Sequence, residues 1–256
     1  MNNPWFLSSA AKTVDLQLFC LPYAGGTAMI YRDWVNHLPP TVQLIRVELP
    51  GRGARLKEAP FDNLPSLVEA LTEALLPVLQ APFVFFGHSM GAMIAFETAR
   101  RLQRDHGRIP QLLMVSGRRA LHIPDPDRLT YNLPTDKFIA ELHEIGGSPK
   151  EALEHPGLME VMLPLLRADF QLVETYQYTP GSPLECPITA FGGLQDKEEN
   201  RDLLLPWKVQ TNSNFRLRML PGDHFFLRSS QSLLLRLVTQ ELIETIMRGS
   251  KKNGRN

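Results

Sequence analysis

The sequence predicts an α/β fold in which helices cover both faces of a mostly parallel β-sheet. Several short runs are almost continuously apolar, as expected for strands that are buried on both faces. These runs alternate with segments in which apolar residues recur at helical spacing, which is the pattern of parallel βαβ units. One long interval between two strands lacks a strand pattern and indicates a helical insertion.

The composition agrees with one domain of this kind. The chain has 256 residues, of which 43% are hydrophobic and 21% charged, so it can bury a sizeable core. Its formal net charge is zero, which argues against nucleic acid or an anionic membrane as a partner. The sequence shows neither a membrane span nor a signal-peptide pattern. The two cysteines, Cys20 and Cys186, lie in strand-like runs, so we expect buried thiols and a cytoplasmic protein.

Six strands are expected from short runs of apolar and β-branched residues. They cover residues 16–21, 42–47, 83–87, 112–117, 187–193 and 215–220. Three helices are expected where leucines and other apolar residues recur every three or four positions. They cover residues 64–79, 90–104 and 230–247.

The interval between the fourth and fifth strands has helical patterns of its own. One helix is opened by Thr135 or Asp136 and closed by glycine, and another follows in P-G-L-M-E-V-M-L-P-L-L-R-A-D-F. A structureless loop of this length is improbable, so the interval is interpreted as a lid. The chain then divides into a core (1–117 and 184–250), a helical lid (118–183) and a disordered tail (251–256).

The stretch F-V-F-F-G-H-S-M-G-A, residues 83–92, carries the main chemical signal. It places Ser89 between two glycines, at the end of a strand and the start of a helix. A G-x-S-x-G turn of this kind exposes a serine hydroxyl in a strained conformation that only small neighbours permit. It also aims the free N–H groups of the helix terminus at any oxyanion formed there. Ser89 is therefore the predicted nucleophile.

A serine nucleophile needs a base and an orienting acid, which follow it in the order acid, then histidine. His224 is the one histidine that follows the last strand, and it is the predicted base. Asp196 follows the preceding strand at its carboxyl end and is the predicted acid. His88 is expected to pack or to hydrogen-bond locally. Three other acids remain open as alternatives: Asp125, Asp127 and Asp223.

Two backbone N–H groups are expected to stabilise the oxyanion. One belongs to Met90, the residue after the nucleophile, and the other to Ala24 in the P-Y-A-G-G loop after the first strand. The expected substrate-lining residues are Tyr23, next to this loop, and Met159, Met162 and Phe170 in the lid. Apolar stripes like the one that contains these three lid residues most often belong to a hydrophobic core. That some of the residues line an acyl tunnel is therefore a hypothesis.

Six blocks resemble the type II (editing) thioesterases of non-ribosomal peptide and polyketide synthesis, which have an α/β-hydrolase fold. They are F-C-L-P-Y-A-G-G, V-E-L-P-G-R-G, G-H-S-M-G-A, S-G-R-R-A, L-R-A-D-F-Q-L-V-E-T-Y and G-D-H-F-F-L. Two features depart from the patterns of relatives. Tyr23 stands where many members have histidine, and Ser116 stands where many chain-releasing thioesterase domains have the acid.

The resemblance implies hydrolysis of acyl groups from the phosphopantetheine arm of carrier proteins, with no cofactor of the enzyme's own. It implies the same roles for Ser89, Asp196, His224, Met90 and Ala24. The partners would be acyl or peptidyl carrier domains of a synthase, and a monomer is the default expectation. Carrier proteins are generally acidic, so three cations near the mouth of the site are candidates for steering them: Arg118, Arg119 and Lys150.

Other functions remain open at this point. The same fold and motifs suit a medium-chain fatty acyl thioesterase or a small-molecule carboxylesterase. A catalytically silent module that docks on a synthase is a further alternative, although the intact order of serine, aspartate and histidine argues against it.

Overall fold

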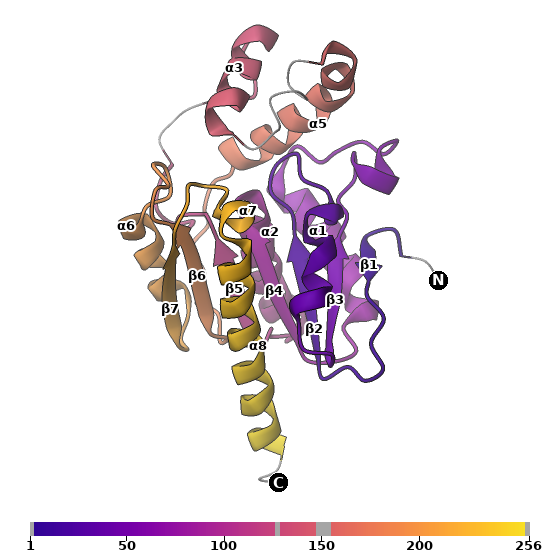
Figure 1. The fold of residues 1–256 in the computed structure, drawn as a ribbon, viewed down its shortest axis with the longest axis vertical. Coiled ribbons are helices and arrows are strands. Elements are labelled where there is room, and N and C mark those ends of the chain that lie inside the picture. The colour runs from indigo at the N-terminus through magenta and orange to yellow at the C-terminus, as the bar shows by residue number, and fades with distance from the viewer. Residues whose placement is uncertain (1–2, 126–128, 147–154, 254–256) are drawn as a thin grey trace.

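The computed structural model describes residues 3–125, 129–146 and 155–253. Its centre is a seven-stranded sheet in the order β1-β3-β2-β4-β5-β6-β7 (Figure 1). The strands are β1 (Phe6–Ser8), β2 (Leu16–Leu21), β3 (Val42–Val47), β4 (Phe83–His88), β5 (Leu112–Ser116), β6 (Ile188–Gly193) and β7 (Phe215–Leu220). All neighbours are parallel except β1, which pairs antiparallel with β3. The predicted α/β fold is confirmed.

All six expected strands are present, and β1 is the one that the sequence did not predict. A strand of three residues is too short to show a period of two, so no pattern marks it. Its position at the edge of the sheet depends on pairing with a distant segment, from Phe6 opposite Val47 to Ser8 opposite Ile45.

Helices cover both faces of the sheet, as the near-continuous apolar strands predict. Each face of the sheet has its own apolar cluster, and alternate side chains of β4 belong to different ones. Phe83 and Phe85 lie in the cluster that contains α1 (Leu64–Leu75) and α2 (Met90–His106). Val84 and Phe86 lie in the cluster on the other face. That second face is covered by η1 (Ala28–His37) and α8 (Gln231–Asn253). The shorter elements are η2 (Gly53–Arg55), η3 (Leu76–Val78), α6 (Arg201–Leu204), η4 (Leu205–Gln210) and α7 (Phe226–Ser229).

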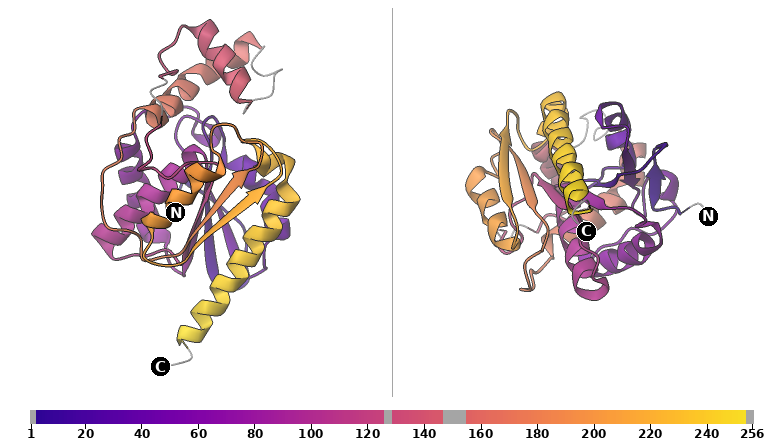
Figure 2. Two further views of the ribbon diagram at one scale, coloured as in Figure 1. Left: turned by 90° about the vertical axis from the view of Figure 1, so that its left-hand side faces the viewer. Right: turned by 90° about the horizontal axis from the view of Figure 1, so that it is seen from below.

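Two further helices, α3 (Thr135–Ile145) and α5 (Pro156–Glu174), lie above the carboxyl ends of the strands (Figure 2). Both fall within the interval predicted to form a lid. Gly146 directly follows α3 and caps it, and its φ of 77° is the left-handed conformation that glycine commonly adopts after a helix. The two helices share a small apolar cluster, separate from the clusters on the sheet, that contains Phe138, Leu142, Met159 and Leu166.

The prediction of a disordered tail from residue 251 needs a correction. Helix α8 continues to Asn253, and residues 254–256 lie outside the described part of the chain. The helix continues because Lys251 and Lys252 have good helix propensity and can extend the ladder of backbone hydrogen bonds.

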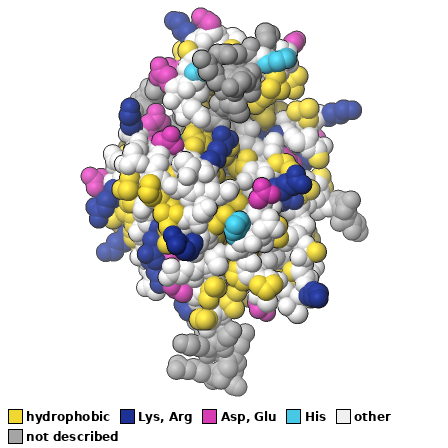
Figure 3. All heavy atoms as spheres, in the orientation of Figure 1, with side chains coloured by type: hydrophobic (Ala, Val, Ile, Leu, Met, Phe, Trp, Pro, Cys, Tyr) yellow, Lys and Arg dark blue, Asp and Glu magenta, His cyan; other side chains and the backbone are white. Residues whose placement is uncertain are grey.

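The surface carries charges of both signs. Lysine and arginine side chains lie interspersed with aspartate and glutamate over the face in Figure 3, in line with the zero net charge. On β7, Arg216 and Arg218 alternate with apolar residues and pair with Glu241 of α8 at 3.0 and 3.4 Å. Within the described residues, none of the helices combines the length and apolar character that crossing a membrane requires.

Candidate active site

Ser89 occupies a strained turn between β4 and α2. Its φ of 51° and ψ of −116° make it the one non-glycine residue with a positive φ among those described. A Cβ atom on Gly87 would lie 2.1 Å from the backbone oxygen of Gly91, and a Cβ on Gly91 would lie 2.2 Å from that of Leu21. Both contacts are impossibly short, so the two glycines are required for β4, α2 and β2 to meet at this turn.

His224 and Asp196 come from neighbouring loops at the carboxyl ends of β7 and β6. His224 Nδ1 lies 2.8 Å from Asp196 Oδ2, while Oδ1 accepts the N–H groups of Glu198 and Glu199 at 3.0 Å each. Burial by itself would raise the pKa of Asp196, but these hydrogen bonds and the nearby imidazole outweigh burial and lower the pKa. The carboxylate is therefore ionised at neutral pH and fixes one nitrogen of the ring.

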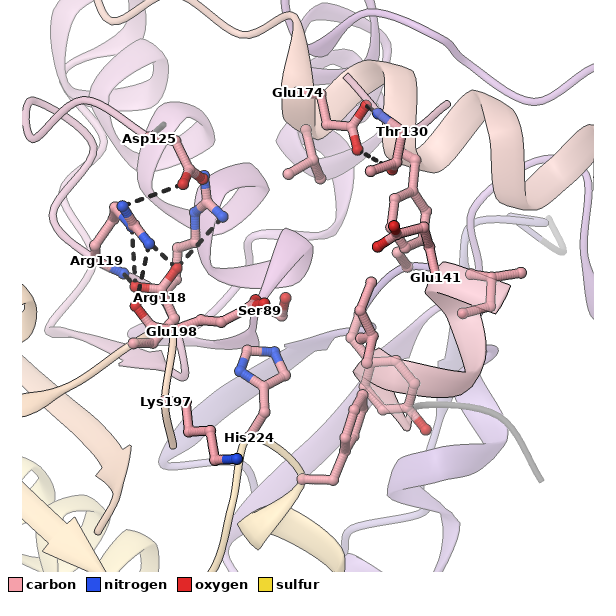
Figure 4. A pocket seen from close by; sticks show the side chains of 18 of the residues that line it. Ser89, Arg118, Arg119, Asp125, Thr130, Glu141, Glu174, Lys197, Glu198 and His224 are labelled. Atoms are coloured by element: carbon pink, nitrogen blue, oxygen red, sulfur yellow. Dashed lines mark hydrogen bonds and ion pairs between the residues drawn. The ribbon is translucent and has the colours of Figure 1, made fainter. Parts of the chain in front are cut away.

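Ser89 lies beside the same imidazole. The close-up in Figure 4 shows its side chain beside the ring of His224, and both residues line one cavity. The structure thus brings together the three residues predicted for the triad, from the ends of β4, β6 and β7.

The competing acids have other partners. Asp125 contacts Arg118 at 2.8 Å and Arg119 at 3.1 Å. The Asp223 side chain accepts a hydrogen bond of 2.9 Å from the N–H of Phe225, two residues further along the same loop. Asp127 lies outside the described residues. Asp196 is therefore the candidate that geometry favours.

His88 lies beneath the site as a fully buried neighbour. Its Nδ1 is 2.9 Å from Ser116 Oγ, and its ring centroid is 5.2 Å from that of His224. Burial, followed by the nearby imidazole of His224, lowers the pKa of His88 well below its ordinary value. The ring is therefore neutral, and it packs locally as expected.

Both residues predicted to supply the oxyanion donors lie near Ser89: Met90 follows it directly, and Ala24 lines the same cavity. Met90 is the first residue of α2, so its N–H has no acceptor within the helix. Ala24 follows β2 and lines the cavity, whereas the next two N–H groups are engaged: Gly25 donates to Asp169 and Gly26 to the Tyr23 carbonyl. No acceptor for the Ala24 N–H is found among the described residues.

The cavity in front of Ser89 has a volume of about 710 Å³. Tyr23 and Phe170 line it as predicted, but Met159 and Met162 are not among the lining residues that the structure describes. Instead they pack into the separate cluster shared by α3 and α5. Among the apolar lining residues that were not predicted, four lie on α3 and α5 at helical spacing that is visible in the sequence: Leu142, Ile145, Leu166 and Val173.

One side of the cavity is charged. Glu199 is 3% exposed and pairs with Arg119 at 3.2 Å and with Arg118 at 3.5 Å. Burial raises the pKa of Glu199, and the two guanidinium groups oppose this. Because both arginines are already paired with carboxylates, they are poorly suited to steer an acidic partner. Lys150 lies outside the described residues.

The described part of the chain contains no group of three or more histidine, cysteine, aspartate or glutamate residues arranged to hold a metal ion. What the arrangement offers chemically is a hydroxyl beside an imidazole, a carboxylate bound to that imidazole, and the backbone N–H groups of Met90, next to Ser89, and of Ala24, on the cavity wall. Such a set is suited to acyl transfer.

Comparison with known proteins gives the family. A model described as a thioesterase domain matches residues 16–247. Linear gramicidin dehydrogenase LgrE of Brevibacillus parabrevis is 42% identical over 93% of this chain and 92% of its own length. RedJ, a thioesterase from the prodiginine biosynthetic pathway in Streptomyces coelicolor, is 37% identical, with a TM-score of 0.85 over 91% of this chain and 94% of its own. The type II thioesterase BorB of the borrelidin biosynthetic cluster is 32% identical, with a TM-score of 0.86 over 95% and 98%.

The name of LgrE states a dehydrogenase, but the present sequence lacks the G-x-G-x-x-G fingerprint of dinucleotide-binding folds. Its G-R-G at 51–53 is followed by Leu56 where that fingerprint needs glycine. The strand-to-helix turn carries G-x-S-x-G instead. The resemblance to type II thioesterases is confirmed by these relatives, and the chain belongs to the thioesterase domain family.

Proposed function

We propose that this thioesterase removes acyl groups from the phosphopantetheine arm of carrier proteins that serve a non-ribosomal peptide or polyketide synthase. The observation that carries the proposal is the placement of Ser89 and His224 on one large cavity, with Asp196 hydrogen-bonded to the ring of His224. The partner class is supported by the names of relatives from such biosynthetic pathways. We infer a cytoplasmic monomer, in line with two buried free cysteines.

In the first step Ser89 Oγ attacks the thioester carbonyl carbon while His224 Nε2 takes the hydroxyl proton. Asp196 holds the ring by its Nδ1–H and stabilises the imidazolium that forms. The negative charge that develops on the carbonyl oxygen is stabilised by the N–H groups of Met90 and Ala24. The C–S bond then breaks, and the pantetheine thiolate, a good leaving group, takes the proton from the imidazolium, so that His224 is neutral again before water attacks.

In the second step water releases the acyl group from Ser89. His224 removes a proton from the water as the oxygen attacks the acyl carbon, and the same two N–H groups stabilise the second oxyanion. The proton then passes to Ser89 Oγ as the ester bond breaks, and the free acid leaves. The residues of the chain supply every group that this cycle needs, so no cofactor is invoked.

The test is release of acyl groups from a carrier protein loaded with several acyl chains, compared with the corresponding acyl-CoA and simple esters. Ser89→Ala is expected to lower kcat at least about 10³-fold, because the nucleophile and the base act as a unit. Ser66→Ala, at an exposed position of α1, is the matched control and is expected to retain wild-type rates.

The outcomes separate the alternatives. Full activity of Ser89→Ala would contradict the mechanism. Faster turnover of simple esters than of any carrier-bound acyl group would show a carboxylesterase, and a strong preference for medium-length fatty acyl chains would show a fatty acyl thioesterase. Absence of covalent labelling of Ser89 by a serine-directed phosphonate would favour a silent docking module.

A further inference from the structure

A buried ion pair joins the lid helix α5 to the core. Asp169 of α5 contacts Arg52, in the loop after β3, through two hydrogen bonds of 2.7 and 2.9 Å. The exposed fractions of the two side chains are 2% and 3%. The residues are 117 positions apart, so the contact depends on the folded arrangement of lid and core.

The same two side chains also hold the loop that carries Ala24. Asp169 Oδ2 accepts the N–H of Gly25 at 2.7 Å, and Arg52 Nη1 donates to the carbonyl of Gly26 at 3.2 Å. The peptide that follows Ala24 is therefore bound to α5 by the N–H of Gly25, while the carbonyl of Gly26 is bound to Arg52 of the core. Ala24 itself lines the cavity, and no acceptor for its N–H is found among the described residues.

Close packing adds to these hydrogen bonds. Gly25 has a φ of 72°, and a Cβ atom there would lie 2.6 Å from Cδ2 of Leu166. Leu166 is one turn of α5 before Phe170 and lines the cavity. The lid helix therefore lies directly against the loop, and a shift of α5 cannot leave the loop in place.

Stability alone does not explain this pair. Desolvation of two buried charges roughly offsets their attraction, so such pairs add little net stability compared with apolar residues of similar size. A bidentate pair does fix geometry, because both oxygens and both nitrogens must keep their directions. Neither Asp169 nor Arg52 is among the described residues that line the cavity, so neither is placed to touch the substrate.

We propose that Asp169 and Arg52 are positioning residues for the oxyanion donor Ala24, so that the lid helix sets the geometry of the catalytic centre. This rests on the proposed function, since it assigns the Ala24 N–H to the oxyanion. An N–H that is displaced from the oxyanion loses most of its effect on the transition state and little of its effect on ground-state binding.

The experiment compares Asp169→Asn and Arg52→Lys with Glu241→Gln in the intact chain. Glu241 is a matched control because it is also 2% exposed and ion-paired, with Arg216, but it lies on α8. Release of acyl groups from a loaded carrier protein is measured at a temperature where circular dichroism shows every variant folded. Both test variants are expected to lower kcat about 10- to 100-fold with KM within about threefold, whereas Glu241→Gln stays within about twofold of wild type.

A second measurement separates positioning from a purely structural role. A trifluoromethyl ketone, which forms a tetrahedral oxyanion on the serine, should bind Asp169→Asn more weakly by the same factor as kcat falls. A non-hydrolysable thioether analogue of the substrate should bind the variant and wild type equally. Equal loss for both inhibitors, or an unchanged kcat, would overturn the proposal.

Failure of the underlying function would look different. If wild type and Ser89→Ala released acyl groups equally slowly, the thioesterase mechanism would be wrong. If wild type were active and Ser89→Ala inactive while Asp169→Asn kept the wild-type kcat, only the positioning role would be wrong. Should Asp169→Asn fail to fold, Arg52→Lys decides, because it retains the positive charge but not the bidentate contact.

Discussion

Ser89 shows how one residue can be constrained from several sides. Its positive φ is unfavourable for a residue with a Cβ atom, and it persists because the surrounding structure fixes the turn. The glycines at 87 and 91 allow backbone atoms to approach where no side chain fits. The N–H of Ser89 also donates to the Ser116 carbonyl at 2.8 Å, which ties the turn to β5. The hydroxyl is thereby presented toward His224 before any substrate arrives.

His88 predicts a pH dependence of stability. The buried ring is neutral in the folded chain, because burial lowers its pKa, but in the unfolded chain it takes up a proton below about pH 6.5. The unfolded state then binds more protons, so the free energy of unfolding falls as the pH drops below that value, by up to about 1.4 kcal/mol per pH unit. His88→Gln removes this effect, and the stability difference between wild type and variant should narrow as the pH falls.

Urea unfolding between about pH 7.5 and pH 5.5 checks this expectation. The control is His106→Gln at an exposed position, which is expected to follow the wild-type dependence. Parallel curves for wild type and His88→Gln across the range would contradict the neutral state of the buried ring.

At the scale of elements, α5 contributes to the site in three ways. It forms part of the cavity wall through Leu166 and Phe170, and it binds the Ala24 loop through Asp169. Near its end, Glu174 accepts the backbone N–H groups of Thr130 and Tyr131 at 2.7 and 3.0 Å, which anchors the chain segment leading into α3. One helix therefore couples substrate space, oxyanion geometry and lid attachment.

Two residues of one apolar stripe on α5 predict different effects of substitution, because Phe170 lines the cavity and Met162 is not among the described lining residues. Phe170→Ala enlarges the cavity, so we expect the preference among acyl chains to shift toward longer ones, by about tenfold for each added methylene pair that fills the space. Met162→Ala is the control, because Met162 packs within the lid and is not among the described lining residues. The measurement is kcat/KM for a series of acyl chains on one carrier protein. A shift of equal size in both variants would contradict this division.

The sequence predicted six of the seven strands and indicated the triad residues for identifiable physical reasons. Strands buried on both faces are continuously apolar, and catalytic loops follow the carboxyl ends of parallel strands, so Asp196 and His224 could be chosen by loop position. The residues of the α5 stripe that line the cavity could not be identified, because apolar periodicity marks a face but not what each residue on it contacts; Met159 and Met162 were expected at the cavity for this reason. The pairing of Arg52 with Asp169 was equally invisible, since it joins two distant segments.

At the scale of the whole molecule, the lid is a packing unit of its own. Its apolar cluster is small and includes Phe138 and Leu142, whereas the two clusters on the sheet are far larger. Units with few buried apolar contacts open at lower free-energy cost than the core. The lid is therefore expected to open locally while the sheet stays folded.

Amide hydrogen exchange tests this separation with two alanine substitutions of fully buried phenylalanines. Phe138→Ala is expected to cost the lid about 3–5 kcal/mol and to speed exchange in α3, with little change in β4. Phe86→Ala, in the middle of β4, should speed exchange throughout the chain, since it destabilises the sheet. Equal acceleration of α3 and β4 by Phe138→Ala would show one cooperative unit instead.

The charged outer strand β7 has a consequence for behaviour in concentrated solution. A second copy that added a strand beside Arg216 and Arg218 would have to remove water from guanidinium groups that are already paired with Glu241 and Glu244. The opposite margin of the sheet is β1, which offers only three residues as a template. Both edge strands therefore disfavour the addition of a strand from a second copy, and we expect the protein to resist edge-to-edge aggregation at high concentration.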